Sequence, residues 1–283
     1  MLACTGQNDP SVSSVNGELQ GVFSISPIKK IHFSQGNLQY QASTKTWRFA
    51  EHQYDTIGAN NVKVSANYDG WIDYFGWGTS GFNSNYPHKT GFSVQDYGIG
   101  TDDISGTNYD WGVYNKISNG GNKAGSWRTM TRDEWQYIFF DRPNATQLFG
   151  WATMNGIYGI ILLPDDWKKP EGITFISHQE TRYDQDDKMH GGMLYDDNVL
   201  ILKEWVEMEK AGAVFLPAAG CRSRGDHSII YSPKSGTGMY WSSTYAYLMY
   251  FDAFGFEFGL LDLSEGGSID YDGLSVRLVK ELE

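Results

Sequence analysis

The order of apolar and polar residues along the chain predicts many short β-strands. Apolar residues alternate with smaller or polar ones, or form runs of strand length, in segments bounded by turn residues. These segments are 22–25, 31–33, 38–40, 47–49, 157–163, 213–217, 239–244, 247–254, 256–263 and 274–279. Gly255 and the pair Gly266 and Gly267 predict turns between the last three, so we expect antiparallel sheet at the end of the chain.

A first helix is predicted from a capping box, because Thr131 and Glu134 stand in a Thr-x-x-Glu pattern. In such a pair each side chain accepts a hydrogen bond from the backbone N–H of the other residue, which stabilises the first turn. The helix is expected to end before Pro143, since proline cannot continue it. Its buried side would carry Trp135, Ile138 and Phe139.

A second helix is predicted over residues 198–210, with Asn198 as its N-cap and Gly212 as its stop. Its buried stripe is expected to contain Leu202, Trp205 and Val206. Two separate helices among many strands are typical of an α+β fold. A doubly wound α/β fold would instead alternate strands with helices along the chain.

The segment from Tyr68 to Gly125 is rich in Gly, Asn, Asp and aromatic residues and shows no sustained helical or strand period. We therefore predict a long, packed loop region there. Residues 21–283 are expected to form one domain. The polar run within residues 1–20 cannot bury enough apolar surface to fold, so we predict that it is a tether.

Composition narrows the class of protein further. Aromatic residues make up 15% of the chain, so a large core can form without disulfides. The formal net charge of -12 and the lack of a cluster of Lys and Arg argue against a nucleic-acid partner. No apolar stretch reaches the roughly 18 to 20 residues that span a bilayer, so membrane contact is expected only through a covalent anchor.

The start of the chain, Met1-Leu2-Ala3-Cys4, resembles the lipobox of bacterial lipoproteins. The resemblance implies that diacylglycerol is attached to the thiol of Cys4, which would place the protein on the cell surface or outer membrane, outside the cytoplasm. The alternative is a chance cysteine near a disordered terminus. Cys221 lies beside the apolar run 214–219, which predicts an inert, buried thiol.

Four further segments resemble one domain family when they are taken together and in order. They are WRTMTRDEW at 127–135, AGAVFLPAAG at 211–220, YWSST at 240–244 and SVRLVK at 275–280. They resemble the Fibrobacter succinogenes major paralogous domain, which is common in secreted and lipidated proteins of gut Bacteroidetes. More distantly they resemble the sulfatase-modifying, formylglycine-generating family. The resemblance implies a C-type-lectin-like fold, in which two helices flank small antiparallel sheets and long loops carry variation.

The more distant family raises the question of an enzyme. Its activity depends on two nearby thiols that bind copper, and a single thiolate cannot replace two. Cys221 stands alone in the C-terminal part, so we predict no catalytic residue and no enzyme activity. A formylglycine-generating type of enzyme, or a hydrolase with an acidic pair that no motif marks, stays as the alternative.

Metal and cofactor motifs are weak or missing in the sequence. The segments 216–218 and 241–243 lack the carboxamide and carboxylate groups with which true C-type lectins hold calcium. The acidic loop from Asp184 to Asp197 lacks the spacing of a calcium loop and is expected to be solvated. The histidines show no zinc spacing. Gly76, Gly78 and Gly81 match a dinucleotide motif, but no helix is expected after them. We predict no metal and no cofactor.

The candidate ligand-binding residues are aromatic: Trp71, Tyr74, Phe75 and Trp77. Flat rings of this kind stack on sugar faces when they are exposed, and the alternative is that they pack in the core. The sequence thus favours a cell-surface binding or adhesion module whose partner is a glycan or a surface protein. The alternatives are the enzyme described above and a structural subunit of a surface assembly such as a pilus tip.

Overall fold

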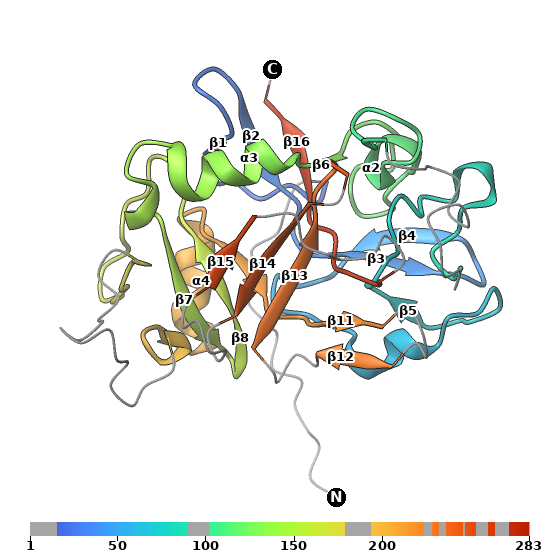
Figure 1. The fold of residues 1–283 in the computed structure, drawn as a ribbon. Helices are drawn as coiled ribbons and strands as arrows, with labels where there is room; N and C mark the ends of the chain where they lie inside the picture. Colours follow the sequence, from blue (N-terminus) through green and yellow to red (C-terminus); the bar gives the residue numbers. More distant parts are fainter. Residues whose placement is uncertain are drawn as a thin grey trace, which may run out of the picture.

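A computed structural model describes residues 16–89, 102–178, 194–223, 228–231, 236–245, 247–252, 260–263 and 272–282. Within this part of the chain, small sheets that are almost wholly antiparallel combine with a few helices (Figure 1), so the predicted α+β class is confirmed. Cys4 and the acidic residues Asp184, Asp186 and Asp187 lie outside the described residues.

The first sheet joins the two ends of the fold. Its order is β1 (Phe23–Ser24), β2 (Lys30–Phe33), β16 (Leu278–Glu281) and β6 (Arg128–Thr129). Within β2, Ile31 and Phe33 are buried while Lys30 is exposed, as period-2 alternation predicts. Strand β16 lies between β2 and β6, so the last strand of the chain is an inner strand of this sheet.

The folded part begins before Gly21, which corrects the predicted boundary of the tether. Glu18 forms a β-bridge with Ser34, and the backbone N–H of Leu19 donates to the carbonyl of Phe33. The Leu19 side chain is only 6% exposed and belongs to the main group of core residues. A single apolar residue in a polar run gave no periodic signal, although its burial fixes the start of the domain.

The second sheet is more deeply buried. Its order is β10 (Val214–Pro217), β8 (Ile157–Leu162), β7 (Phe149–Met154) and β9 (Val199–Leu200), of which β9 runs parallel to β7. Strand β7 was not predicted. Its residues are almost all buried, so it lacks the polar alternation that marks a half-buried strand.

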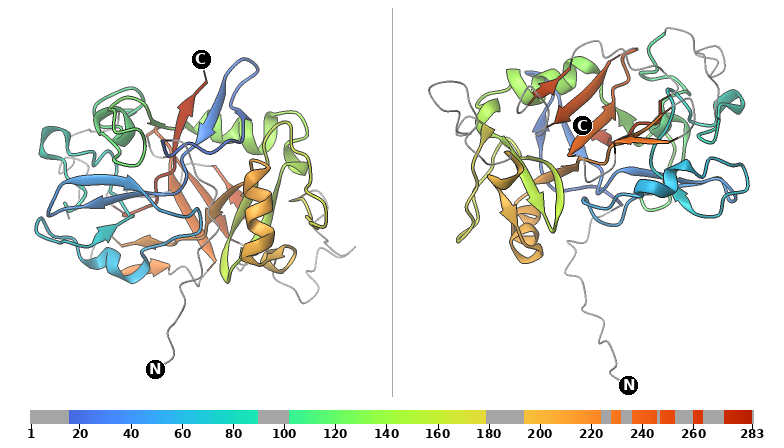
Figure 2. Two further views of the ribbon diagram at one scale, coloured as in Figure 1. Left: turned by 180° about the vertical axis from the view of Figure 1, so that it is seen from behind. Right: turned by 60° about the horizontal axis from the view of Figure 1, so that its bottom comes forward.

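Helix α4 (Leu202–Lys210) covers one face of this sheet (Figure 2). Its end before Gly212 is confirmed, but the prediction that Asn198 caps it is wrong. The N-cap is Ile201, whose backbone N–H donates to the Glu204 carboxylate at 3.0 Å. The Asn198 amide instead donates to the carbonyls of Trp151 and Ile176. Trp205 and Val206 are buried as predicted, Met208 joins them, and Leu202 is half-buried.

Helix α3 (Arg132–Gln136) packs on the other side of the sheet and continues as a π-helical turn, η3 (Tyr137–Asp141). The predicted capping box is confirmed, since Thr131 and Glu134 each accept a hydrogen bond from the other's backbone N–H. The helical segment ends before Pro143, and Trp135, Ile138 and Phe139 are buried as predicted.

The remaining elements are short. Strands β13 (Thr237–Trp241), β14 (Leu248–Asp252) and β15 (Leu260–Asp262) form a meander, β11 (Cys221–Arg222) pairs with β12 (Ile229–Tyr231), and β3 (Leu38–Gln41) lies between β4 (Thr46–Phe49) and β5 (Trp71–Ile72). Short helical turns are η1 (Gly58–Val62), η2 (Phe82–Ser84), α2 (Trp111–Tyr114), η4 (Ala145–Gln147) and η6 (Leu194–Asp196). The described parts of the segment 68–125 are thus mostly loop, as predicted.

A buried arginine links the first two sheets. Arg277 precedes β16, and its guanidinium donates to the carbonyl of Ser34 at 2.9 Å and to the carbonyl of Phe215 at 2.7 Å. It also donates to the side-chain oxygen of Asn37 at 3.1 Å. Burial lowers the pKa of Arg277 to about 10. The cation is held by neutral acceptors, because the fork of N–H donors matches several carbonyl groups at once.

Candidate functional site

A small cavity opens beside the β3–β4 hairpin and is the candidate functional site. Its volume is about 190 Å³, below the roughly 300–1,000 Å³ of pockets that take drug-sized ligands. The cavity therefore fits one small ring rather than a large cofactor. The residues that line it are Tyr40, Lys45, Trp47, Ser80, Gly81, Tyr86, Tyr114 and Asn115.

Two buried rings form the floor of the cavity. Tyr40 on β3 and Trp47 on β4 are direct cross-strand partners, and their ring centroids lie 4.5 Å apart. Paired aromatic residues stabilise a hairpin through this kind of contact. The hairpin thereby places a rigid aromatic surface at the bottom of the cavity.

Two more tyrosines form the walls, and both reach solvent. Tyr114, the last residue of α2, is 41% exposed and packs edge-to-face on Phe82 at 5.4 Å. Tyr86 is half-buried, and the Nζ atom of Lys45 lies 5.1 Å from the centre of its ring. The cavity thus offers flat aromatic faces to a ligand, together with one cation.

The hydroxyl group of Tyr40 stands out among the polar groups of the cavity. It is buried and has no hydrogen-bond partner among the described residues. Burial raises the pKa of Tyr40 to about 12, and the neighbouring Tyr86 adds to this effect. Leaving a buried hydroxyl without a partner costs about 1–3 kcal/mol.

The loop before Tyr86 owes its shape to glycine and asparagine. Gly78 and Gly81 have φ angles of 61° and 97°, which other residues rarely adopt. The Asn85 amide donates to the carbonyl of Gly78 at 3.0 Å and closes the turn. The short η2 turn follows Gly81 where a dinucleotide site would need a full helix. Gly76, Gly78 and Gly81 therefore belong to a tight turn.

The aromatic residues singled out in the sequence lie elsewhere. Tyr74, Phe75 and Trp77 are fully buried, so they present no ring face to a ligand. The alternative that these residues pack in the core is therefore correct for these three. Trp71 is half-buried on β5, and the Arg48 guanidinium lies 3.8 Å from its ring centre. None of these four lines the cavity.

The cavity residues carried no signal of their own in the sequence. Tyr40 and Trp47 were recognised only as strand residues, and Tyr114 belongs to a four-residue helix too short to produce a period. Lys45 has a φ of 53° in the hairpin turn, a conformation that non-glycine residues seldom adopt. The pairing of β3 with β4 brings Tyr40, Lys45 and Trp47 together, and tertiary packing brings Tyr114 to them.

The buried carboxyl groups of Asp73 and Asp110 have raised pKa values, but both accept hydrogen bonds that hold the fold together. Asp110 accepts hydrogen bonds from the backbone N–H groups of Gly112 and Thr129. Asp73 accepts from the Asn61 amide at 2.7 Å and from the backbone N–H of Ile57. Burial raises the pKa of each carboxyl to about 6. Since neither is exposed to solvent, neither offers a carboxylate to a substrate.

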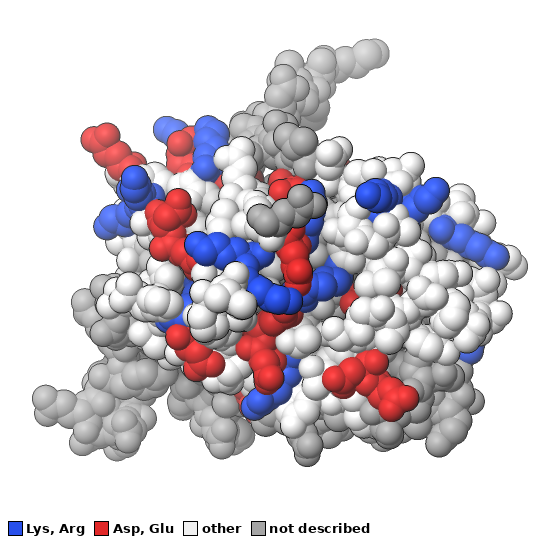
Figure 3. Space-filling view, turned by 90° about the horizontal axis from the view of Figure 1, so that it is seen from above, with Lys and Arg blue, Asp and Glu red and all other residues white. Residues whose placement is uncertain are grey.

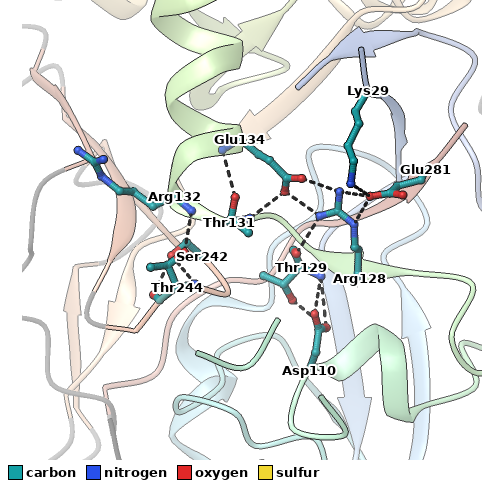
Figure 4. Close-up of polar contacts among 10 residues, drawn as sticks. All are labelled: Lys29, Asp110, Arg128, Thr129, Thr131, Arg132, Glu134, Ser242, Thr244 and Glu281. Atoms are coloured by element: carbon teal, nitrogen blue, oxygen red, sulfur yellow. Dashed lines mark hydrogen bonds and ion pairs between the residues drawn. The ribbon is translucent and has the colours of Figure 1, made fainter. Parts of the chain in front are cut away.

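A charged network on the surface also has a structural role (Figure 4). Arg128 donates to both carboxylate oxygens of Glu134 at 2.7 Å and to Glu281 at 2.8 Å, and Lys29 lies 3.5 Å from Glu281. These contacts join the start of α3 to β6 and β16. On the face seen in Figure 3, basic and acidic side chains are interspersed over the described surface, without a broad area of one sign.

Cys221 is a buried thiol, as predicted. Within the described part of the chain, no group of three or more His, Cys, Asp or Glu side chains could hold a metal ion. Among the same residues no helix has the length and apolar character needed to cross a bilayer. Comparison of the chain with models of protein families, with curated proteins and with solved structures gives no significant match.

Proposed function

We propose that the protein is a non-catalytic binding module that takes a glycan through the cavity beside the β3–β4 hairpin. The observation that carries the proposal is a small cavity lined by four aromatic residues, among which Tyr114 is 41% exposed and Tyr86 is half-buried. Sugars present an apolar ring face and a rim of hydroxyl groups. The cavity offers a surface of matching chemistry for each.

A C-type-lectin-like fold is part of this proposal. It is supported by the small antiparallel sheets, by helices α3 and α4, and by the loop-rich segment between β5 and β6 that contributes Ser80, Tyr86 and Tyr114 to the cavity. Loops held by a rigid scaffold can vary without loss of the fold, which suits recognition. The resemblance to the Fibrobacter succinogenes major paralogous domain points the same way.

The proposal also includes a lipid anchor on Cys4 and a position on the cell surface, from which the cavity would reach glycans outside the cell. The support for this part is the lipobox-like start of the chain. Intact-mass measurement on protein from the native membrane fraction tests it. A diacylglycerol-modified Cys4 is expected, and an unmodified thiol in that fraction would contradict it.

A glycan array probed with the full chain and two variants tests the binding function. Tyr114→Ala is expected to weaken the strongest glycan signal about three- to tenfold, since one aromatic contact contributes about 0.5–1.5 kcal/mol. Phe140→Ala is the matched control, because Phe140 is 42% exposed against 41% for Tyr114 and lies outside the cavity.

The array gives a clear negative outcome as well. If no glycan binds the chain, or if Phe140→Ala lowers the signal as much as Tyr114→Ala does, glycan binding in this cavity is excluded. Circular dichroism of each variant checks that the fold is retained, so that a loss of signal reports on the cavity alone.

A further inference from the structure

The charge of the cavity is unusual for this chain. The protein carries a formal net charge of -12, yet Lys45 is the one charged residue among those that line the cavity. No acidic side chain of the described residues lies within ion-pair distance of Lys45. Among the described residues, the ammonium group of Lys45 lies over the ring of Tyr86, and the Lys45 side chain is exposed to solvent, where an anionic group can approach it.

The hairpin turn holds Lys45 in this position. The backbone N–H of Lys45 donates to the carbonyl of Ala42 at 3.3 Å, and the hydroxyl of Thr44 lies 2.6 Å from the side chain of Gln41. The positive φ of Lys45 sets the direction in which its side chain leaves the turn. The aromatic floor and the cation thus come from the same rigid hairpin.

The imidazole of His88 lies next to Tyr86, and its pKa depends on the nearby charges. His88 stacks on Tyr86, with ring centroids 5.3 Å apart and planes at 8°. Burial lowers the pKa of His88, and the positive charges of Lys45 and Lys89 lower it further. Lys45 therefore lies close enough to act on the imidazole ring that stacks on Tyr86.

Resting on the proposed function, we infer that the cavity selects a sugar unit that carries an anionic group. The sugar ring lies against the exposed ring of Tyr114, and the anionic group meets the ammonium group of Lys45. A carboxylate on a uronic acid supplies this chemistry within a single ring, and the cavity of about 190 Å³ admits one ring. A contact between an anionic group and an exposed ammonium group corresponds to a preference of about two- to fivefold.

Titration calorimetry with the full chain tests this inference. The ligands are short oligomers of galacturonate, glucuronate and mannuronate, the methyl esters of the same oligomers, and a sulfated galactan oligomer. At least one uronate oligomer is expected to bind about two- to fivefold more tightly than its methyl ester, because esterification removes the charge and keeps the ring. Tighter binding of the sulfated oligomer, with the same dependence on Lys45, also supports an anionic ligand and identifies sulfate as its source.

Two lysine variants separate a local contact from the overall charge of the protein. Lys45→Met is expected to remove the preference for the charged oligomers. Lys203→Met removes the same charge from the exposed side of α4, which lies across the molecule from the β3–β4 hairpin (Figure 1), and should leave binding unchanged.

The outcomes distinguish this inference from the proposal on which it rests. Equal binding of the oligomers and their methyl esters, or an unchanged preference in Lys45→Met, overturns the anionic selectivity. Glycan binding itself then stands, provided that Tyr114→Ala still weakens it. If neither charged nor neutral glycans bind, both the selectivity and the proposed function fall.

Discussion

At the scale of single residues, the buried carboxyl of Asp110 shows how one side chain can organise a region. It caps α2 by accepting from Gly112, and it accepts from both the backbone N–H and the hydroxyl of Thr129 on β6. The carboxyl is shielded from water, so burial raises its pKa to about 6 although these three donors favour the charged form. Its ionisation is therefore linked to the stability of the fold.

This linkage predicts how stability changes with pH. A carboxyl whose pKa rises from 3.8 to about 6 on folding binds more protons in the folded state between those values. Its contribution to stability is therefore present at low pH and is lost as the pH rises through 6. Asp110→Asn removes this dependence, so the variant should gain on the order of 3 kcal/mol relative to the wild type between pH 4 and pH 7.5.

Urea unfolding at the two pH values measures the difference. Asp166→Asn is the control, since Asp166 is exposed and should give the same difference from the wild type at both pH values. A difference for Asp110→Asn that does not change with pH would show that the carboxyl titrates as it does in the unfolded chain.

At the scale of elements, capping and strand patterns in the sequence gave correct predictions only where the residues that interact lie close together along the chain. The capping box of α3 joins residues three apart, and it was predicted correctly. The start of α4 was predicted too early. Asn198 is a good capping residue, but its side-chain amide donates to the carbonyls of Trp151 and Ile176, which are distant in sequence. Strand β7 was missed because tertiary burial of both faces removes its alternation.

The capping box of α3 also gives a prediction. Thr131→Ala removes the side-chain acceptor for the backbone N–H of Glu134, and it should lower the free energy of unfolding by about 1 kcal/mol. Chemical denaturation measures this change. Thr131→Ser keeps the hydroxyl and should stay close to the wild type. A serine variant as unstable as the alanine variant would assign the loss to the methyl group of Thr131 instead.

At the scale of the whole molecule, the sequence predicted the class of fold better than the candidate site. The α+β class followed from many short strands with two helices, which are local features. The cavity depends on the pairing of Tyr40 with Trp47 and on the approach of Tyr86 and Tyr114 from loops far along the chain. No local sequence pattern predicts that these residues come together. Of the four aromatic residues that the sequence did mark, Tyr74, Phe75 and Trp77 are buried and Trp71 is half-buried outside the cavity.

The start of the folded part provides a test at this scale. Leu19 lies in the core, so Leu19→Ala should lower the free energy of unfolding by about 2–3 kcal/mol, as other buried leucines do. Ile28→Ala is the matched control, because Ile28 is 91% exposed and should change stability by less than about 0.5 kcal/mol. Thermal and urea unfolding of both variants measure the two effects. If the two variants lose the same free energy of unfolding, the folded part begins after Leu19.

The inner position of β16 has a consequence for how the protein is made. On the ribosome, β1 and β2 emerge first and β6 follows, but the strand that connects β2 to β6 is synthesised last. Arg277, which links this strand to β10, emerges with it. Until β16 emerges, the nascent chain therefore carries two open strand edges that are available to neighbouring chains. Strand β16 then completes a sheet whose other strands were synthesised earlier.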